Sequence, residues 1–338
     1  MAGNKAEQVI QLGKETTKGT AVAATAIWRG QGGQLQDDRT VTFVPEQVGY
    51  AVPTNRTYTG KLGGSLAMAA TPATFEQLPY LFEASIIAET PAADGAGSGI
   101  IYDYVQGTVS VNSIRTYTLE SGDNQQAEEM AYCFVTDWTL SAEAGDAVMM
   151  SANWIGREPA PTTITDLITA GPQTVETILA GKGSLYIDAS SGTAGTTQVS
   201  DTLLGWSLNY TSGRQAKYTV DSGQLYFDFD YFDIDSFDAV LNLKYEHNAS
   251  AVTEKAAWRA ETARLIQLKV TGSTLTTSGT TYSVKTLILN MAGKYETFEA
   301  LSDENGNSIV NCTFRVSYDE TDDTVFEAIV VNQLAALV

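Results

Sequence analysis

Short runs in which apolar and polar residues alternate recur along the whole sequence. They are rich in Val, Thr, Tyr and Phe, and the clearest lie at 134–140, 206–210, 241–245 and 312–318. Side chains of a strand point alternately to its two faces, so this pattern predicts half-buried β-strands. Asn305-Gly306, between two such runs, predicts a β-hairpin. The chain is therefore expected to be mainly β.

Helical patterns are few. The first expected helix, 72–84, begins at Pro72, and Pro79 should kink or divide it. The second, 250–264, has Ser250 as its expected N-cap and is rich in Ala, Glu, Lys and Arg.

The order of elements around these helices predicts an internal repeat. A strand precedes each helix, at 65–69 and at 241–245. The expected strands after the first helix are 101–111, 114–120, 132–140 and 147–154, and those after the second are 265–270, 282–290, 295–300, 309–318 and 325–331. When the two halves are aligned by the spacing of their elements, the expected strand 132–140 corresponds to 309–318, and 147–154 corresponds to 325–331. The predicted fold is two tandem β-sandwich or half-barrel domains, each with one flanking α-helix.

A Pro-rich stretch at 157–163 divides the chain, and all eight prolines lie at or before Pro172. Such a shift in composition predicts two independently shaped halves. The predicted organisation is an N-terminal arm (1–27), a first domain (28–157), a linker (158–175) and a second domain (176–338).

The formal net charge is −20, from 40 acidic and 20 basic residues. Binding to nucleic acid needs Lys and Arg to displace counterions from phosphates, so this charge argues against wrapping DNA or RNA. An acidic wall suits a conduit that DNA passes without sticking, although solubility alone also explains the charge. Mean hydropathy is −0.10. No apolar run reaches the ~18 residues of a membrane span, and no signal peptide is recognised, so synthesis and retention in the cytoplasm are expected.

Motifs for catalysis or metal binding are missing from the sequence. His247 is the one histidine, and no G-x-S-x-G motif frames a nucleophile. Cys133 and Cys312 lie in apolar runs and are expected to be buried thiols. The Gly181–Ser184 stretch fails the phosphate-loop pattern because Glu176 and Gly183 stand where it needs Gly and Ser/Thr. No catalytic, cofactor-binding or metal-binding residue is assigned, and no enzyme activity is expected.

The segment 226–238, YFDFDYFDIDSFD, is the most unusual in composition. Its oxygen-rich spacing suggests Ca²⁺, but Phe232 and Asp233 occupy the third-ligand and glycine positions of an EF-hand loop. A structural interpretation fits better, with the aromatic residues on one strand face and an acidic face that lines a lumen or meets solvent. The residues so placed are Phe227, Phe229 and Tyr231 against Asp228 and Asp230.

Residues 13–21, GKETTKGTA, are similar to the GxETTxGT opening of tail tube subunits from long-tailed, siphovirus-type bacteriophages. The succession that follows also resembles this family: Gly32-Gly33-Gln34-Leu35, Arg39-Thr40-Val41, Pro45-Glu46 and Gly49. The resemblance implies a β-sandwich with one helix, whose inner strands join those of neighbouring subunits around a channel. It further implies rings stacked into a virion tail tube, assembled in the host cytoplasm, through which double-stranded DNA passes. Tape-measure and tail terminator or tip proteins are the implied partners, with no membrane and no cofactor.

One domain of this family needs about half the chain, so a duplication would let three chains form a pseudo-sixfold ring. Closed rotational symmetry stops growth within the plane of the ring. A head-to-tail contact along the ring axis stays open and therefore builds a filament. The N-terminal arm (1–27) and the loop 88–99 are candidates for segments that become ordered when rings stack. Deletion of residues 1–24 is expected to impair stacking more than folding, and the channel surface should be net negative.

Two other functions stay open. One is a different viral or surface assembly protein, such as a capsid decoration or adhesin-like module. The other is a β-fold carbohydrate-active enzyme, which would need a pair of carboxylates at hydrolytic spacing.

Overall fold

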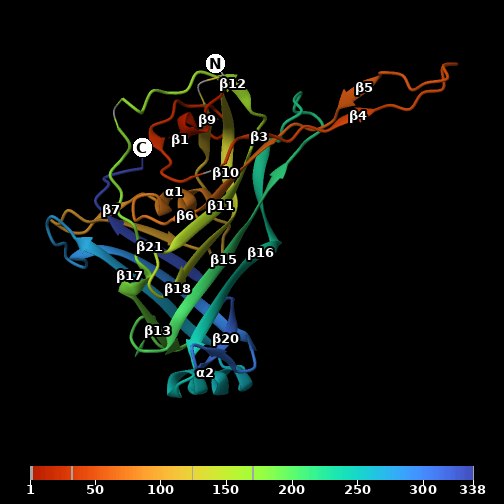
Figure 1. The fold of residues 1–338 in the computed structure, drawn as a ribbon. Helices are drawn as coiled ribbons and strands as arrows, with labels where there is room; N and C mark the ends of the chain where they lie inside the picture. Colours follow the sequence, from red (N-terminus) through yellow and green to blue (C-terminus); the bar gives the residue numbers. More distant parts are fainter. Residues whose placement is uncertain (1–2, 32, 124, 170, 338) are drawn as a thin grey trace.

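The structure is a computed structural model, and it describes residues 3–31, 33–123, 125–169 and 171–337. It is mainly β, as expected, with long antiparallel strands in crossing layers and short helical segments (Figure 1). The strands before residue 165 are β1 (Val9–Lys14), β2 (Ala26–Ile27), β3 (Gln36–Asp37), β4 (Val41–Phe43), β5 (Thr57–Thr59), β6 (Gly64–Pro72), β7 (Ala92–Ala93), β8 (Ile100–Val105), β9 (Tyr117–Gly122), β10 (Ala127–Glu143), β11 (Met149–Gly156) and β12 (Ala160–Thr162). Those after it are β13 (Gly183–Ala189), β14 (Gln198–Val199), β15 (Leu203–Lys217), β16 (Phe229–Glu246), β17 (Arg264–Thr274), β18 (Val284–Phe298), β19 (Ser302–Glu304), β20 (Asn307–Val316) and β21 (Phe326–Asn332). The helices are α1 (Leu78–Ser85) and α2 (Ala249–Arg259), with short 3₁₀ turns at Lys5–Glu7 and Ala180–Lys182.

The strands of the first half form two layers that share β10. The first part of β10 lies in the order β2–β1–β9–β10–β12, and its second part lies in the order β3–β6–β11–β10. A bulge between Met130 and Cys133 separates the two parts, and Tyr132 within it has a φ of 57°. Bulges bend a strand, which lets β10 pass from one layer to the other.

The same seven pairings recur in the second half. The first part of β18 lies in the order β14–β13–β17–β18–β21, and its second part in the order β15–β16–β20–β18. Gly293 stands where β18 changes layer, and a Cβ there would lie 2.1 Å from the backbone oxygen of Arg315. We call the first set of strands unit 1 and the second set unit 2.

Two contacts join the units into one body. Residues 137–143 of β10 pair with residues 205–211 of β15, so one layer continues from β3 to β18 as an eight-stranded sheet. In the other layer β21 pairs with β8, a strand from the first half of the chain that has no counterpart in the second half. One hydrophobic core contains side chains of both units, such as Leu119 and Leu289. The ranges 28–157 and 176–338 thus pack as a single body, and their assignment to two separate domains stays a prediction.

The repeat differs from the one expected after the helices. Matching by spacing set 132–140 against 309–318, whereas equivalent pairings match β10 with β18, β11 with β20 and β12 with β21. The reason is an insertion: residues 86–113, with β7 and β8, separate α1 from β9, but α2 leads almost directly into β17. The extra segment displaces every later element of unit 1 along the sequence.

Both helices are shorter than expected. The strand β6 continues through Pro72, and α1 begins only at Leu78, with Pro79 in its first turn. A proline there breaks no helical hydrogen bond, so it starts the helix and does not kink it. The N-cap of α2 is Asn248, whose side chain accepts hydrogen bonds from the N–H groups of Ser250 and Ala251.

The described part of the predicted N-terminal arm, 1–27, is not an arm. Strand β1 lies between β2 and β9, and Ile10 and Leu12 are buried in the core. Deletion of residues 1–24 would therefore remove a central strand and should impair folding itself, contrary to the expectation that it impairs stacking more than folding. The predicted linker, 158–175, begins as β12 beside β10 and continues as an irregular thread along one side of the molecule to β13 (Figure 1).

Candidate functional surfaces

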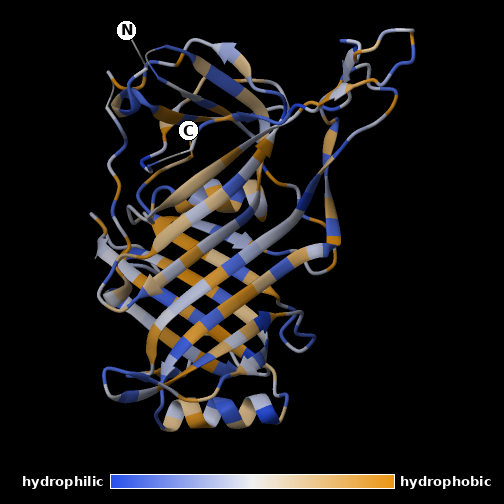
Figure 2. Ribbon diagram, turned by 45° about the vertical axis from the view of Figure 1, so that its right-hand side comes forward, coloured by the Kyte–Doolittle hydropathy of each residue, from blue (hydrophilic) through white to orange (hydrophobic). Residues whose placement is uncertain are grey.

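The outer face of the eight-stranded sheet is polar. Buried apolar side chains alternate along its strands with polar ones, which appears as bands of different hydropathy in Figure 2. Polar side chains of this face bond across neighbouring strands: Thr139 Oγ1 donates to Asn209 Oδ1 at 2.9 Å, and Asn153 Nδ2 donates to Asp137 Oδ1 at 2.6 Å. Such cross-strand bonds make a continuous hydrophilic surface over both units.

Two bases of this face each contact two acids. Lys244 Nζ lies 3.3 Å from Glu143 and 2.8 Å from Glu304. Arg315 likewise contacts two carboxylates, those of Asp238 at 2.6 Å and Glu296 at 3.0 Å. The exposed Lys294, which pairs in register with Arg315, makes no ion pair among the described residues, so the excess of acids is local to Lys244.

The joint between the units is well packed on the inner side of this sheet. Trp138 of β10 stacks on Tyr210 of β15, with ring centroids 4.8 Å apart and planes 11° from parallel. Leu140 and Leu208, opposite each other in the same pairing, are fully buried. Offset aromatic pairs add to the burial of apolar area, so the joint is a firm contact.

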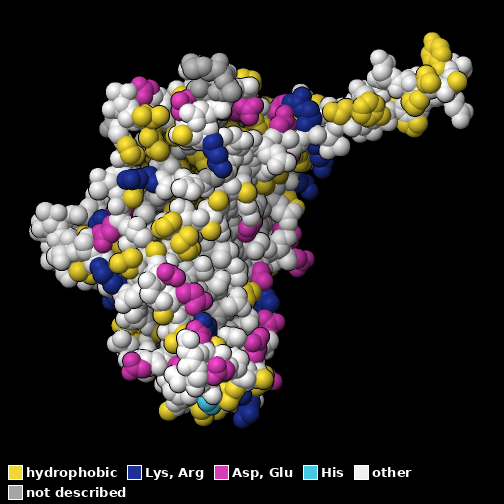
Figure 3. Space-filling view, viewed as in Figure 1, with side chains coloured by type: hydrophobic (Ala, Val, Ile, Leu, Met, Phe, Trp, Pro, Cys, Tyr) yellow, Lys and Arg dark blue, Asp and Glu magenta, His cyan; other side chains and the backbone are white. Residues whose placement is uncertain are grey.

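A hairpin projects far from the body. Residues 40–60, which we call the arm, contain β4 and β5, and these two strands pair only with each other among the described strands (Figure 1). Large apolar side chains of the arm are exposed by 47–75%, and they gather on it in Figure 3. They are Val41, Phe43, Val48, Tyr50, Val52 and Tyr58. The arm's two charged residues, Glu46 and Arg56, pair with each other at 2.8 Å. The arm is thus a neutral, apolar projection on a strongly acidic protein.

The motif at 13–21 holds the bend of β10 in place. The buried carboxylate of Glu15 accepts bonds from the N–H groups of Gly19 at 2.7 Å and Tyr132 at 2.8 Å. It also accepts from the hydroxyls of Thr116 at 2.5 Å and Thr118 at 3.1 Å. The loop after β1, strand β9 and the bulge of β10 therefore meet at one side chain.

Two lysines of the motif tie it to other elements. Lys14 pairs with Glu83 of α1 at 2.8 Å, and Lys18 pairs with Asp230 of β16 at 2.6 Å. The Arg157 guanidinium donates to the carbonyl of Gly19 at 3.3 Å. The motif is thus a set of structural contacts within the first half of the chain, with one ion pair, Lys18–Asp230, that reaches unit 2.

The segment 226–238 is placed differently from the expectation. Phe227 is buried, but Phe229 is 46% exposed. Asp230 does not face solvent or a lumen: it is buried against Arg214, Lys18 and the hydroxyl of Tyr132. The acidic face was expected from alternation alone, whereas Asp230 here lies between Lys18, in the loop after β1, and Arg214 of β15, which neutralise its charge.

The loop 88–99 is held by the chain itself. The carboxylate of Asp94 accepts from the N–H groups of Thr281, at 2.9 Å, and Tyr282, at 2.6 Å. Burial opposes the ionisation of Asp94, but these backbone bonds lower its pKa below the usual value. The loop is therefore held in place by contacts within the chain.

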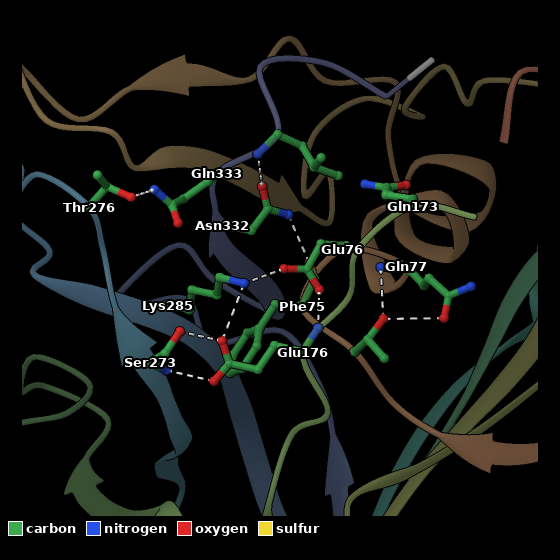
Figure 4. A network of polar contacts seen from close by, with 12 residues as sticks. Phe75, Glu76, Gln77, Gln173, Glu176, Ser273, Thr276, Lys285, Asn332 and Gln333 are labelled. Carbon is green, nitrogen blue, oxygen red and sulfur yellow. Dashed lines mark hydrogen bonds and ion pairs between the residues drawn. The ribbon is translucent and has the colours of Figure 1, made fainter. Parts of the chain in front are cut away.

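A polar network joins the start of α1 to unit 2 (Figure 4). Lys285 Nζ lies 2.6 Å from Glu76 and 3.2 Å from Glu176, and the N–H of Ser273 donates to Glu176 at 2.6 Å. Burial disfavours the charge of Lys285, but the hydrogen bonds and charges of the two glutamates raise its pKa above the usual value. Glu176 follows the predicted linker, so the network fastens the end of the linker to both units.

A pair of acids lies on the outside of the other layer. Burial is the main cause that raises the pKa of Asp103 in β8 to about 6, and repulsion from Glu327 of β21 is the second cause. This pair lies beside the β21–β8 contact between the units.

The remaining candidates lie in separate elements. Cys133 and Cys312 are free and buried, in β10 and β20, and His247 precedes α2. Residues 181–184 lead from a 3₁₀ turn into β13. No group of three or more His, Cys, Asp or Glu suited to a metal ion occurs among the described residues. No helix in the described ranges is long and apolar enough to span a bilayer.

Comparison with known proteins returned no matching family model and no matching curated protein.

Proposed function

We propose that this protein is the tail tube subunit of a long-tailed bacteriophage, and that copies of it assemble into stacked rings around a channel for double-stranded DNA. The observation that carries the proposal is the repeated set of seven strand pairings, with its two units joined edge to edge in one sheet. A chain that already joins two like units through sheet edges has the geometry of a ring segment. Three such chains would supply six units to a pseudo-sixfold ring in the virion tail.

The arm supports assembly beyond one chain. Two-stranded hairpins are at best marginally stable alone in water. An arm with six exposed large apolar side chains therefore points to a partner, and large exposed apolar patches are typical of interaction sites. The proposed partner is another copy in an adjacent ring. Its neutral tip lets two acidic chains meet without direct repulsion.

The outer face of the eight-stranded sheet is the proposed channel wall. It is polar, and its Lys244 and Arg315 each pair with two carboxylates. These carboxylates compete with the phosphates of a passing genome for the two cations, which would help DNA to slide. Tape-measure and terminator or tip proteins would set the length and close the ends of such a tube.

Electron microscopy of the purified protein at high concentration tests this function. Stacked rings with a central hole are expected. Discrete closed particles would favour another kind of assembly protein. A monomer at every concentration would contradict the proposal and reopen the enzyme alternative.

A further inference from the structure

We infer that the edge segment at residues 297–301, at the end of β18, pairs with residues 34–38 of a second copy, in the same register in which β10 pairs with β15 inside the chain. The inference rests on the proposed function and specifies which edges close the ring. We call 297–301 the donor edge and 34–38 the acceptor edge.

Strand irregularities align the two units residue by residue. In unit 1 the β10–β11 pairing has a bulge between Val135 and Asp137, and in unit 2 the β18–β20 pairing has one between Tyr295 and Thr297. Bulges are specific features of a sheet, so their recurrence at the same step of the repeat fixes the alignment.

Pairings on both sides of the bulge agree with this alignment. Before it, Val135 pairs with Trp154 and Trp154 with Leu66, while Tyr295 pairs with Phe314 and Phe314 with Leu241. All six side chains are buried in the core.

Beyond the bulge, Trp138, Ala152 and Met68 form one row of paired residues, and Phe298, Cys312 and Leu243 form the equivalent row. Residues 139 and 299 follow these rows and are therefore equivalent.

The acceptor edge aligns through the next strand. Gln36 pairs with Ser65 in unit 1, and Asn209 pairs with Val240 in unit 2. Ser65 directly precedes Leu66 and Val240 directly precedes Leu241, the two aligned residues of the previous row. Gln36 is thus equivalent to Asn209.

The internal joint then predicts the contact between copies. Thr139 faces Asn209 inside the chain, so Glu299 should face Gln36 of the second copy. The first pair is joined by a side-chain hydrogen bond, and a glutamate and a glutamine can form one as well. Both Glu299 and Gln36 are exposed in the single chain.

Both edges are available for this contact. The donor edge runs beside β20, with the N–H of Glu299 donating to the carbonyl of Asn311, and no described strand pairs with its other side. Strand β3 in the acceptor edge pairs with β6 and with no other described strand. Open edges of this kind are templates for strand addition. Because donor and acceptor differ, the contact is head-to-tail, and it produces a ring when the rotation closes.

Cysteine cross-linking tests the register in the full-length protein. The variant E299C/Q36C places two thiols at partner positions of an antiparallel pair, where the Cα separation of ~4.5–5.5 Å allows a disulfide. Oxidation of assembled protein should give covalent dimers and a closed ring band on denaturing gels. A second in-register pair, T297C/D38C, corresponds to the internal pair Asp137–Thr211 and should behave alike.

The matched control moves one cysteine by one residue. In E299C/D37C the two side chains point to opposite sheet faces, so at least about five-fold less cross-linking is expected. All substituted positions are exposed, and the native cysteines are buried, so single-cysteine variants should stay unlinked.

The outcomes separate this inference from the proposed function. Tubes in which both in-register pairs fail to cross-link would overturn the inference and leave the function standing. In-register cross-linking without tubes would support the edge contact and contradict the function. Absence of both oligomers and cross-links at high concentration would overturn both.

Discussion

Glu15 shows how one buried charge can organise a β-rich body. Its carboxylate is about 1% exposed and receives bonds from backbone and hydroxyl donors of three segments. One of these donors is the N–H of Tyr132, whose positive φ marks the bend of β10. A carboxylate with this many donors stabilises a backbone conformation that alternation alone would not produce.

Substitution of Glu15 by glutamine should lower the free energy of unfolding by about 2–4 kcal/mol, because charge-assisted bonds are lost and an amide N–H₂ faces other donors. Denaturant unfolding measures this change. Glu7→Gln, at an exposed acid of the same terminal region, should change it by less than about 0.5 kcal/mol. Equal effects of the two substitutions would contradict the role assigned to Glu15.

Asp103 should make stability depend on pH. Its folded-state pKa, about 6, lies above the ordinary value of 3.8, so the native state favours the protonated form. The stabilisation is complete below the ordinary pKa and is lost as pH rises through about 6. Asp103→Asn should therefore stabilise the protein at pH 8 by about 1 kcal/mol, allowing for solvent screening, and change little at pH 4.

Chemical denaturation of both proteins at the two pH values checks this prediction. Glu327→Gln removes the neighbouring charge and should give a similar gain at pH 8. A gain from Asp103→Asn that is the same at pH 4 would show that ionisation is not its cause.

At the scale of elements, the long strands build the body, whereas the hairpin of the arm projects from it. Strands β10 and β18 each belong to two layers, and both bend at a special backbone position, Tyr132 and Gly293. The strands of the arm, in contrast, pair with no other described strand, and the N–H of Asp38, just before the arm, donates to the carbonyl of Gly63, just after it, at 2.9 Å. Folding and assembly should accordingly depend on different elements.

Replacing residues 41–59 by a Gly-Gly turn should leave the unfolding free energy within about 1 kcal/mol, because the removed side chains bury little area against the body. The same variant should no longer form tubes in electron micrographs. As a control, Val220→Ser removes an exposed apolar side chain elsewhere and should leave assembly intact, whereas Phe43→Ser in the arm should weaken it. Tubes of normal length from the armless protein would contradict the proposed role of the arm.

At the scale of the whole molecule, a formal charge of −20 opposes association of copies. The arm offers the proposed assembly a neutral, apolar contact surface that this charge does not oppose. The internal contact between units is mostly of this kind too, with Trp138 and Leu140 packed on β15.

Tube assembly should therefore increase with ionic strength. Raising salt from about 10 mM to about 150 mM shortens the screening length from ~30 Å to ~8 Å and weakens repulsion between acidic chains. Light scattering at fixed protein concentration measures the change. Assembly that is strongest at low salt would show that ion pairs between copies dominate the contact.

The sequence by itself determined the fold class and much of the repeat. Alternation in short runs depends only on the two faces of a strand, and this local property predicted the mainly β body. Residues with high helix propensity predicted the helix near 250, and the order of the elements predicted a duplication. The sequence also indicated buried cysteines, and it singled out the residues of the 13–21 motif without revealing what they contact.

Only the tertiary structure decided which strands pair, and hence the true register of the repeat, the place of β1 in the core and the burial of Asp230. Strand pairing depends on partners far away in the chain, and an insertion such as 86–113 shifts the spacing without disturbing any local pattern. The joint between β10 and β15, on which the proposed edges between copies depend, likewise joins residues about 70 positions apart, and alternation contains no information about that choice.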